Sequence, residues 1–543
     1  MRDFLLRRAC APAAFAALAL AGGLGACDSE SAGPPPTGLE LHLFAAPSAA
    51  NPFEGVAFIR LLMEGEGLVQ PYTQVTAYQP GGQVSLDGVP FSRNGEARQL
   101  VIEGWTANAQ GQPSALVARG RSLPVEVIAG QPSQTFDVLF ARVNSFMSAT
   151  SSSSLSPQQL AQGRVGHTVT ATDRHEVVIA GGGTMTSATG AWHKGVFDQV
   201  LTSVEAFDQR TLEVSSRSPL LVGRAWHTGT PLSSGQVILA GGYSSTASPL
   251  RDVELYNPVG VLDGTAKPLQ PLAVARAGHT ATLIDEATRT ILFVGGDVNG
   301  TWELWDPVAG SSGVQPLPDA QPRRHHAATT FYLPGRTEPA VLVTGGESES
   351  TVYATAMLYD SVAKSMVPVG QLMPSGARTQ HTATLVPNRN FIYVAGGYTA
   401  VDRTTSTGGI DVFDIGQIGF LLGQEGFRMR TARGGHAAAL GPNNTVVFTG
   451  GSGSEPAGGA IRSLSSIEVV YEYLDPLNGT LNIEVASSWN PSATTAVVPY
   501  MPQERVGVRA LALGNGMTLI VGGASLSGGG YQMVRDLTLY NPL

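Results

Sequence analysis

The sequence predicts an all-β protein, a seven-bladed β-propeller preceded by a small β-sandwich. A block that opens on Arg and ends a buried strand with two glycines occurs seven times. Successive glycine pairs are 60, 54, 50, 51, 54 and 72 residues apart, close to the period of about 50 residues for a four-stranded blade. Ahead of the first block, short runs of alternating polar and apolar residues predict further strands.

Each block has an invariant opening. Its Arg is followed three residues later by His in six copies, and Val508 takes the His place in the seventh. The first glycine comes 17, 17, 19, 22, 18, 17 and 17 residues after the Arg, a spacing too regular for chance. The openings and glycine pairs are Arg164/His167 with Gly181/Gly182, Arg224/His227 with Gly241/Gly242, Arg276/His279 with Gly295/Gly296, Arg323/His326 with Gly345/Gly346, Arg378/His381 with Gly396/Gly397, Arg433/His436 with Gly450/Gly451, and Arg505/Val508 with Gly522/Gly523.

The strands of each block follow from its apolar pattern. Runs such as VVIAGG and FIYVAGG are continuous and too short for helices, as expected of strands covered on both faces. A further strand follows each glycine pair, with alternating apolar residues and an Asp, Asn or Pro exit. These strands are VEAFD (204–208), VELYN (253–257), WELWD (302–306), AMLYD (356–360), IDVFD (410–414), IEVVYEY (467–473) and LTLYN (537–541).

These blocks resemble the kelch repeat, which has an RxxHTAT strand, an apolar strand ending in two glycines and a VEVYD-like strand. The resemblance covers residues 164–543 and implies one blade per repeat around a central channel. The seventh repeat stops at Leu543, after its third strand. We expect residues 144–150 (NSFMSAT) to supply the fourth, so that the propeller spans 144–543 and has no open sheet edge.

Residues 1–26 are expected to be a lipoprotein signal peptide. A basic start (MRDFLLRR) precedes an apolar stretch (APAAFAALALAGG). LGAC, which ends at Cys27, resembles a bacterial lipobox, and this resemblance implies an acyl chain on Cys27. The alternative is an ordinary cleaved signal with Cys27 as a stray thiol. Residues 27–38 are expected to form a proline-rich tether, and Cys27 is then the only cysteine left, so the fold has no disulfide.

Residues 39–143 are expected to form the β-sandwich. Seven short strands are predicted, in LELHLFA, VAFIRLLM, TQVTAYQ, QLVIEGWTA, ALVARGR, LPVEVIAG and TFDVLFARV. The stretch LVIEGWTANAQGQPSALVARGRSLPVEVIAGQ is similar to segments of transthyretin-like and immunoglobulin-like modules. This resemblance implies no activity.

Composition limits the function. A net charge of −9 and a pI near 5.6 argue against nucleic acid as a partner. Six of the ten His occupy the repeat position, where a structural role is expected; the others, His42, His175, His193 and His325, have no metal-site spacing. We therefore expect no metal and no cofactor.

Three classes of kelch-type enzyme differ in the residues that they need. Copper radical oxidases resembling galactose oxidase need a tyrosine crosslinked to a cysteine, and no cysteine lies in the propeller. Sialidase-like proteins need SxDxGxTW turns, which are absent from the sequence. Sialic acid epimerases have no short motif and stay open. Glu347 and Glu349 suit acid–base chemistry, but also a solvated loop.

The candidate binding rim lies on loops after the glycine pairs. Three such loops are long, Gly183 to Ser203, Ser452 to Ser466 and Ala524 to Asp536. The rim residues are Trp192, His193, Tyr243, Asp297, Glu347 and Tyr398. The alternative is that the aromatic residues pack on the next blade.

These features predict a lipoprotein of the bacterial cell envelope that binds a protein or a glycan without catalysis. It would reach the membrane through its lipid anchor, with the outer membrane or cell surface favoured and the inner membrane, facing the periplasm, left open. Two alternatives remain: a carbohydrate-acting envelope enzyme with its site in the propeller mouth, and a structural spacer. An enzyme should show titratable side chains converging at one end of the channel.

Overall fold

The computed structural model describes residues 17–18, 39–47, 49–65, 68–80, 92, 95–127, 134–173, 175–186, 192–257, 266–423, 427–454, 461–474, 481–487, 499–527 and 529–542. Almost all of its regular structure is strand, as predicted. The chain divides into two compact units, residues 1–156 and residues 157–542. Within the described residues, no helix has the length and apolar composition that crossing a membrane requires.

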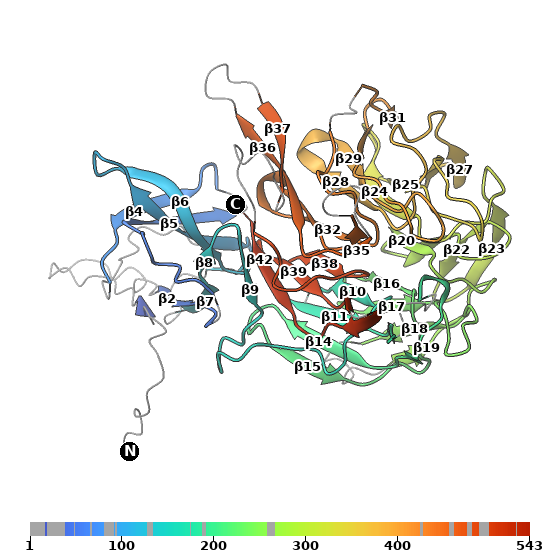
Figure 1. Ribbon diagram of the computed structural model, residues 1–543, viewed down its shortest axis with the longest axis horizontal. Coiled ribbons are helices and arrows are strands. Elements are labelled where there is room, and N and C mark those ends of the chain that lie inside the picture. Colours follow the sequence, from blue (N-terminus) through green and yellow to red (C-terminus); the bar gives the residue numbers. More distant parts are fainter. Residues whose placement is uncertain are drawn as a thin grey trace. The chain divides into compact units, whose positions relative to one another are not determined.

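The N-terminal unit is a sandwich of two sheets. One has the order β4-β3-β5-β6-β8 and the other β1-β2-β7, in which β2 and β7 are parallel (Figure 1). Both sheets contribute to one core, through Ile59 and Ile102 from the first and Leu43 and Val138 from the second. The strands are β1 (Ala17–Leu18), β2 (Leu39–Phe44), β3 (Phe58–Gly65), β4 (Tyr72–Ala77), β5 (Arg98–Ala107), β6 (Pro113–Arg121), β7 (Gln134–Leu139) and β8 (Ala141–Arg142).

One predicted strand of this unit differs. Among the described residues of LPVEVIAG, Val125 alone pairs with a strand, through an isolated bridge to Arg98. Residues 128–133 lie outside the described residues, as do Cys27 and the tether after it.

The seven predicted blades are four-stranded sheets; all neighbouring strands are antiparallel in six of them, as are β38–β39 and β39–β42 in the seventh. The first four are β10 (Thr168–Ala171), β11 (Glu176–Ala180), β14 (Val204–Asp208), β15 (Val214–Arg217); β16 (Thr228–Pro231), β17 (Val237–Ala240), β18 (Val253–Tyr256), β19 (Ala266–Pro268); β20 (Thr280–Asp285), β21 (Thr290–Val294), β22 (Thr301–Asp306), β23 (Gly310–Pro316); and β24 (Ala327–Tyr332), β25 (Pro339–Thr344), β26 (Ala356–Asp360), β27 (Ser365–Pro368). The last three are β28 (Thr382–Val386), β29 (Phe391–Ala395), β30 (Ile410–Asp414), β31 (Gly419–Phe420); β32 (Ala437–Leu440), β33 (Val446–Thr449), β36 (Ile467–Leu474), β37 (Leu481–Ser487); and β38 (Arg509–Ala512), β39 (Thr518–Val521), β42 (Thr538–Asn541), β9 (Ser145–Ser148).

The blades form a closed ring. The first strand of each blade contacts the first strand of the next, in the series β10, β16, β20, β24, β28, β32, β38 and back to β10 (Figure 1). Residues before the first blade also pair with the last, since the Leu160 amide donates to the Arg535 carbonyl over 2.8 Å. The seventh blade has the order β38-β39-β42-β9, with β9 in the place of the fourth strand.

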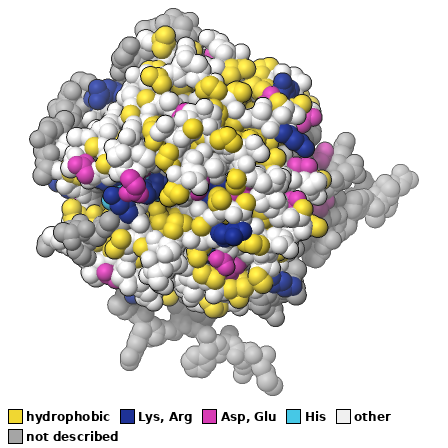
Figure 2. All heavy atoms as spheres, turned by 90° about the vertical axis from the view of Figure 1, so that its right-hand side faces the viewer, with side chains coloured by type: hydrophobic (Ala, Val, Ile, Leu, Met, Phe, Trp, Pro, Cys, Tyr) yellow, Lys and Arg dark blue, Asp and Glu magenta, His cyan; other side chains and the backbone are white. Residues whose placement is uncertain are grey.

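The three long loops contain short antiparallel ribbons. β12 (Gly183–Thr184) pairs with β13 (Gln199–Val200), β34 (Ser452–Gly453) with β35 (Arg462–Ser463), and β40 (Ala524–Ser527) with β41 (Gly530–Met533). The first of these loops also contains the 3-10 turn η1 (Trp192–Lys194). On the face seen in Figure 2, acidic and basic side chains lie interspersed among apolar and neutral polar ones.

The repeated His packs against the glycine pair of the preceding blade. A Cβ on the first glycine would lie 2.4 to 2.9 Å from a His Cε1, and Gly522 has this relation to His167, across the ring closure. In the pair before Val508, the corresponding distance, from Gly450 to Val508 Cγ1, is 3.1 Å. Real Cβ atoms do not come so close, so glycine is required where the blades meet.

The repeated Arg ties each blade together from inside. All seven are buried, and the Arg224 Nη1, for example, donates to the Gly241 carbonyl over 2.8 Å. In five blades, the guanidinium pairs with a carboxylate near the start of the third strand. In the fourth blade, Arg323 pairs instead with Asp319, which lies four residues before it in the sequence. The five pairs are Arg164–Glu205, Arg224–Glu254, Arg276–Glu303, Arg378–Asp411 and Arg433–Glu468. In the seventh blade, Arg505 donates instead to Thr538 Oγ1 over 2.7 Å.

Candidate functional site

The residue just before the repeated His has a left-handed backbone in every blade. Its φ lies between 49° and 67° at Gly166, Trp226, Gly278, His325, Gln380, Gly435 and Gly507. Except for Gly166, the amide of each donates to the carbonyl of its counterpart in the preceding blade, as in His325 N to Gly278 O (2.7 Å) and Gln380 N to His325 O (3.0 Å). The position is therefore set by a chain of hydrogen bonds that runs around the channel.

Three of these seven positions are not glycine. A left-handed backbone costs a residue with a Cβ about 1 to 2 kcal/mol, and four blades avoid that cost. Trp226, His325 and Gln380 accept it. Strain of this kind concentrates at functional sites.

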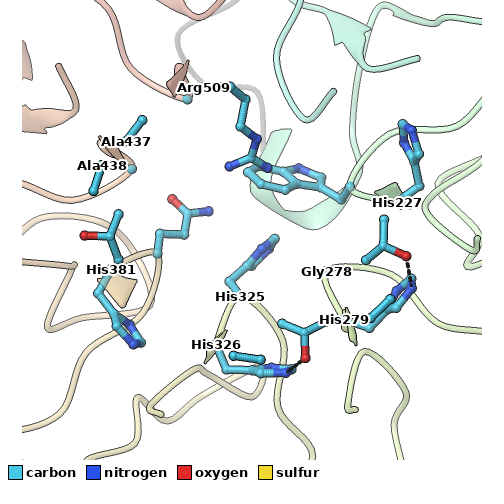
Figure 3. A pocket seen from close by; sticks show the side chains of 18 of the residues that line it. His227, Gly278, His279, His325, His326, His381, Ala437, Ala438 and Arg509 are labelled. Atoms are coloured by element: carbon cyan, nitrogen blue, oxygen red, sulfur yellow. Dashed lines mark hydrogen bonds between the residues drawn. The ribbon is translucent and has the colours of Figure 1, made fainter. Parts of the chain in front are cut away.

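The three side chains line a cavity of about 410 Å³ in the channel, together with Arg509 at the start of β38. Residues from six of the seven blades contribute to its wall. In Figure 3, His325 and Arg509 enter the cavity from opposite sides and point toward one another. The part of the cavity where His325 and Arg509 face one another is the candidate site.

Trp226 is held in place on several sides. The Nε1 of Trp226 donates to the Trp192 carbonyl over 2.8 Å. The rings of Trp192 and Trp226 stack with their centroids 5.5 Å apart. The His325 ring meets it edge-on at 4.5 Å, and the Arg509 Cζ lies 5.5 Å from its centroid. Trp226 thus fixes the relative positions of the imidazole and the guanidinium.

His325 is a neutral imidazole with a defined tautomer. Its Nε2 lies 2.7 Å from the His193 carbonyl oxygen, which only accepts, so Nε2 carries the proton and Nδ1 is an acceptor. Burial lowers the pKa of His325 well below 6.5, and the positive charges of Arg403, Arg324 and Arg509 lower it further. At neutral pH the Nδ1 lone pair is therefore free of a proton.

Arg509 has no carboxylate partner among the described residues. Its Nε donates to the His167 carbonyl over 3.2 Å, and burial alone lowers its pKa. The described lining of the cavity contains neither Asp nor Glu. Beside it, Gln380 is 8% exposed, and neither its Oε1 nor its Nε2 has a partner in the described structure.

The repeated histidines of the cavity wall are engaged between blades. Five have Nε2 within hydrogen-bond distance of a Thr hydroxyl of the preceding blade, at 2.8 to 3.2 Å. Burial lowers the pKa of all six, to about 3 for His326 and His436. They are neutral packing groups, which is the structural role expected from their repetition.

Most of the predicted rim is buried, which corrects that part of the prediction. Trp192 and Tyr243 are 4% and 6% exposed and share one core cluster with Trp226. Tyr398 is 1% exposed, packs where a Cβ on Gly434 would touch its ring, and shares a 2.5 Å hydrogen bond with Ser452. These aromatic residues pack against neighbouring blades and cannot grip a ligand as a rim.

The acidic rim residues are paired. Asp297 Oδ1 is 3.0 Å from Arg276 Nη1, and the buried Glu347 contacts Arg403 at 2.6 Å and Arg324 at 3.5 Å. The exposed Glu349 accepts from Arg324 over 2.5 Å. Glu347 and Glu349 line a separate cavity of about 550 Å³, where arginines neutralise them.

The sixth rim residue, His193, is half-buried, and its pKa falls to about 3, chiefly through burial. The His193 carbonyl accepts a hydrogen bond from the His325 ring, and the Trp192 carbonyl accepts one from the Trp226 ring. The turn η1 therefore positions both side chains through its backbone. The site residues that the sequence reasoning missed are Trp226, His325, Gln380 and Arg509. For Trp226, His325 and Gln380, the available signal was a side chain where the other copies have glycine; Arg509 had no such signal.

No protein-family model and no curated protein matches the chain. Among solved structures, it is similar to a novel fungal alcohol oxidase with catalytic diversity among the AA5 family, in complex with copper (14% identity, TM-score 0.46, covering 70% of this chain and 74% of that one). It is also similar to the structure of YjhT (13% identity, TM-score 0.39, covering 70% and 95%). At such identities the likeness concerns the fold alone.

The first of these structures is an alcohol oxidase, so the comparison does not support the prediction of a non-enzymatic binding protein. The residues of the channel nevertheless do not fit copper. Its described lining has no Tyr, Cys, Asp or Glu. Five of its six histidines face Thr hydroxyls, and the sixth, His325, faces a carbonyl. Across the described residues, no group of three or more His, Cys, Asp or Glu could hold a metal ion.

Proposed function

We propose that the protein is an enzyme that acts on a carbohydrate by acid–base catalysis in the channel cavity. The observation that carries this proposal is the meeting of neutral His325 with Arg509 in that cavity. His325 Nδ1 accepts the proton in this mechanism. Arg509 stabilises the negative charge that develops on the substrate.

The residues favour proton transfer over glycoside hydrolysis. Hydrolysis ordinarily uses two carboxyl groups that flank the bond. The described lining has no carboxyl group and offers one strong acid–base candidate, His325. One such group suffices to remove a proton from carbon or from a hydroxyl.

The pKa of His325 is low chiefly through burial, and a negatively charged substrate would raise it. A base works best when its pKa lies near the working pH. Arg509 is one of the charges that lower the pKa of His325. A bound anion offsets that charge, so the pKa of His325 rises when the substrate is in place.

Proton exchange tests this function. The enzyme is incubated in D₂O with acidic and neutral sugars, and loss of each C–H signal is followed by NMR. We expect exchange with the wild-type protein and a loss of about 100-fold or more in His325→Asn, because general bases contribute roughly that much. His175→Asn is the matched control, since His175 also has a positive φ (61°) but lies outside the cavity lining. Equal exchange in His325→Asn and wild type would refute the proposal.

We further propose that the enzyme belongs to the bacterial cell envelope, anchored through acylated Cys27, with the sandwich as a transthyretin- or immunoglobulin-like spacer. The signal-like residues 1–26 and the LGAC motif support this proposal. Mass spectrometry of the mature N-terminal peptide tests it. An unmodified Cys27, or an intact residue 1, would count against the anchor.

A further inference from the structure

The Arg509 guanidinium has donor groups that can bind an anion. Two contacts hold the side chain: its Nε donates to the His167 carbonyl, and its Cζ lies over the ring of Trp226. Neither Nη atom has a described hydrogen-bond partner. A guanidinium offers two parallel donors that match the two oxygens of a carboxylate.

The buried arginines of the repeat are paired differently. Six of the seven repeat arginines pair with carboxylates, and Arg505 donates to a hydroxyl and a carbonyl. A buried charge without compensation is costly. Arg509 is partly buried, has no carboxylate partner among the described residues, and lies at the edge of a cavity large enough for a ligand.

Gln380 adds a second unfilled group. It is more than nine-tenths buried, lines the same cavity, and leaves both amide atoms unpaired in the described structure. Each unpaired polar atom costs about 1 to 3 kcal/mol. Four blades have glycine at this position, so the ring does not need an amide here.

We propose that this cavity binds an acidic sugar, with the sugar's carboxylate on Arg509 and a hydroxyl on Gln380. The proposal deepens the proposed function and rests on it for the reaction. A volume of about 410 Å³ lies within the range of small-ligand sites and suits one or two sugar rings. Arg509 is the only Arg or Lys in the described lining, which suits a single negative charge.

A carboxylate also fits the chemistry of His325. Nδ1 takes the proton from the carbon that bears the carboxylate, and the C–H electron pair moves into the carboxylate. The resulting enediolate carries its extra charge on the oxygens that Arg509 contacts. Return of a proton to the same carbon completes an exchange, so atoms and charges balance without a further reactant.

Calorimetric titration tests the ligand class without requiring turnover. D-Glucuronate and D-galacturonate are compared with D-glucose, D-galactose and D-glucose 6-sulfate. We expect the uronates to bind at least about tenfold more tightly than the neutral sugars, and Arg509→Gln to remove that preference. His325→Asn should keep the preference for uronates. Arg336→Gln is the control, because Arg336 pairs with Asp360 away from the cavity.

The outcomes separate the two proposals. Equal binding of uronate and neutral sugar by the wild type, or preference for the sulfate alone, overturns the carboxylate site. The carboxylate site is also overturned if Arg509→Gln keeps the preference for uronates while its thermal unfolding matches that of the wild type. If Arg509→Gln does not fold, Arg509→Lys is tested in its place. Uronate preference without C–H exchange supports this inference and refutes the proposed reaction.

Discussion

Left-handed backbone at three residues marks the site more clearly than their chemistry does. Trp226, His325 and Gln380 occupy a position that each blade uses to pass a hydrogen bond to the next. The backbone there is dictated by the ring, and only the side chain is free to vary. A residue with a Cβ at such a position lowers the stability of the fold, which indicates that its side chain is needed for function.

Gln380→Gly should therefore stabilise the protein. The substitution relieves the positive φ (49°) and removes two unpaired amide atoms, while glycine's greater freedom in the unfolded chain offsets part of the gain. We expect the free energy of unfolding to rise by about 1 kcal/mol, measured by urea denaturation. Uronate affinity should fall at the same time.

Asn390→Gly is the matched control for this prediction. Asn390 has a similar φ (54°) but ends the 3-10 turn η2 (Pro387–Arg389), and it is not among the residues that line the cavity. Its change should leave sugar binding intact. A less stable Gln380→Gly protein would show that the amide packs usefully, contrary to our reading of it.

Sequence reasoning reached the structural residues of each repeat but not their partners. Repetition alone indicated that the repeated His holds the blade. The acidic partner was also visible, as the second residue of VEAFD, VELYN, WELWD and IDVFD. Because Arg164 and Glu205 are 41 residues apart, their pairing becomes evident only when the strands are folded. His325 and Arg509 belong to different blades, so their meeting has no local signature.

At the scale of the strands, each His joins two neighbouring sheets, and this makes stability depend on pH. The pKa of His436 falls to about 3 in the folded protein, chiefly through burial, from 6.5 in the unfolded chain. The unfolded state therefore binds the proton more tightly. Stability is complete above pH 6.5 and declines as the pH falls from there toward 3.

His436→Val should weaken this dependence. Val508 occupies the same place in the seventh repeat, so the packing is already tolerated there. Each such His contributes up to about 1.4 kcal/mol per pH unit, and the slope of unfolding free energy between pH 6 and 4 should fall by about that amount. Denaturant titrations at several pH values measure it.

Thr382→Val controls for the lost hydrogen bond. Thr382 Oγ1 lies 3.1 Å from His436 Nε2, so this variant removes the contact but keeps the titrating ring. Its pH slope should match the wild type. Identical slopes for His436→Val and wild type would mean that this imidazole does not titrate on unfolding.

The strands of the blades were predictable because their signal is periodic, and the loops were not. Five-residue runs such as VEAFD and AMLYD have the predicted bounds in β14 and β26. The long loops were expected to present a rim, but their aromatic residues pack inward and the loops form small ribbons. Loop length predicts where chain is available and does not predict which side chains remain exposed.

For the molecule as a whole, ring closure is what creates the cavity. The turns before the first strands all face the axis, so groups from blades two, four, five and seven meet there. β10 meets β38, and His167 packs on Gly522, where the last blade returns to the first. A ring of another size would separate His325 from Arg509.

We propose that β9 fastens this closure, because it takes the fourth place in the seventh sheet although it precedes the first repeat. Replacing residues 145–148 by Gly-Ser-Gly-Ser leaves that sheet with three strands and an open edge. The control is the same replacement in β27, residues 365–368. β27 is also a fourth strand, but it directly follows the other three strands of its sheet in the sequence. We expect β27 loss to lower the unfolding midpoint modestly, and β9 loss to lower it more and to expose the amides of β42 to hydrogen exchange. Equal effects of the two replacements would show that the ring closes through its inner strands alone.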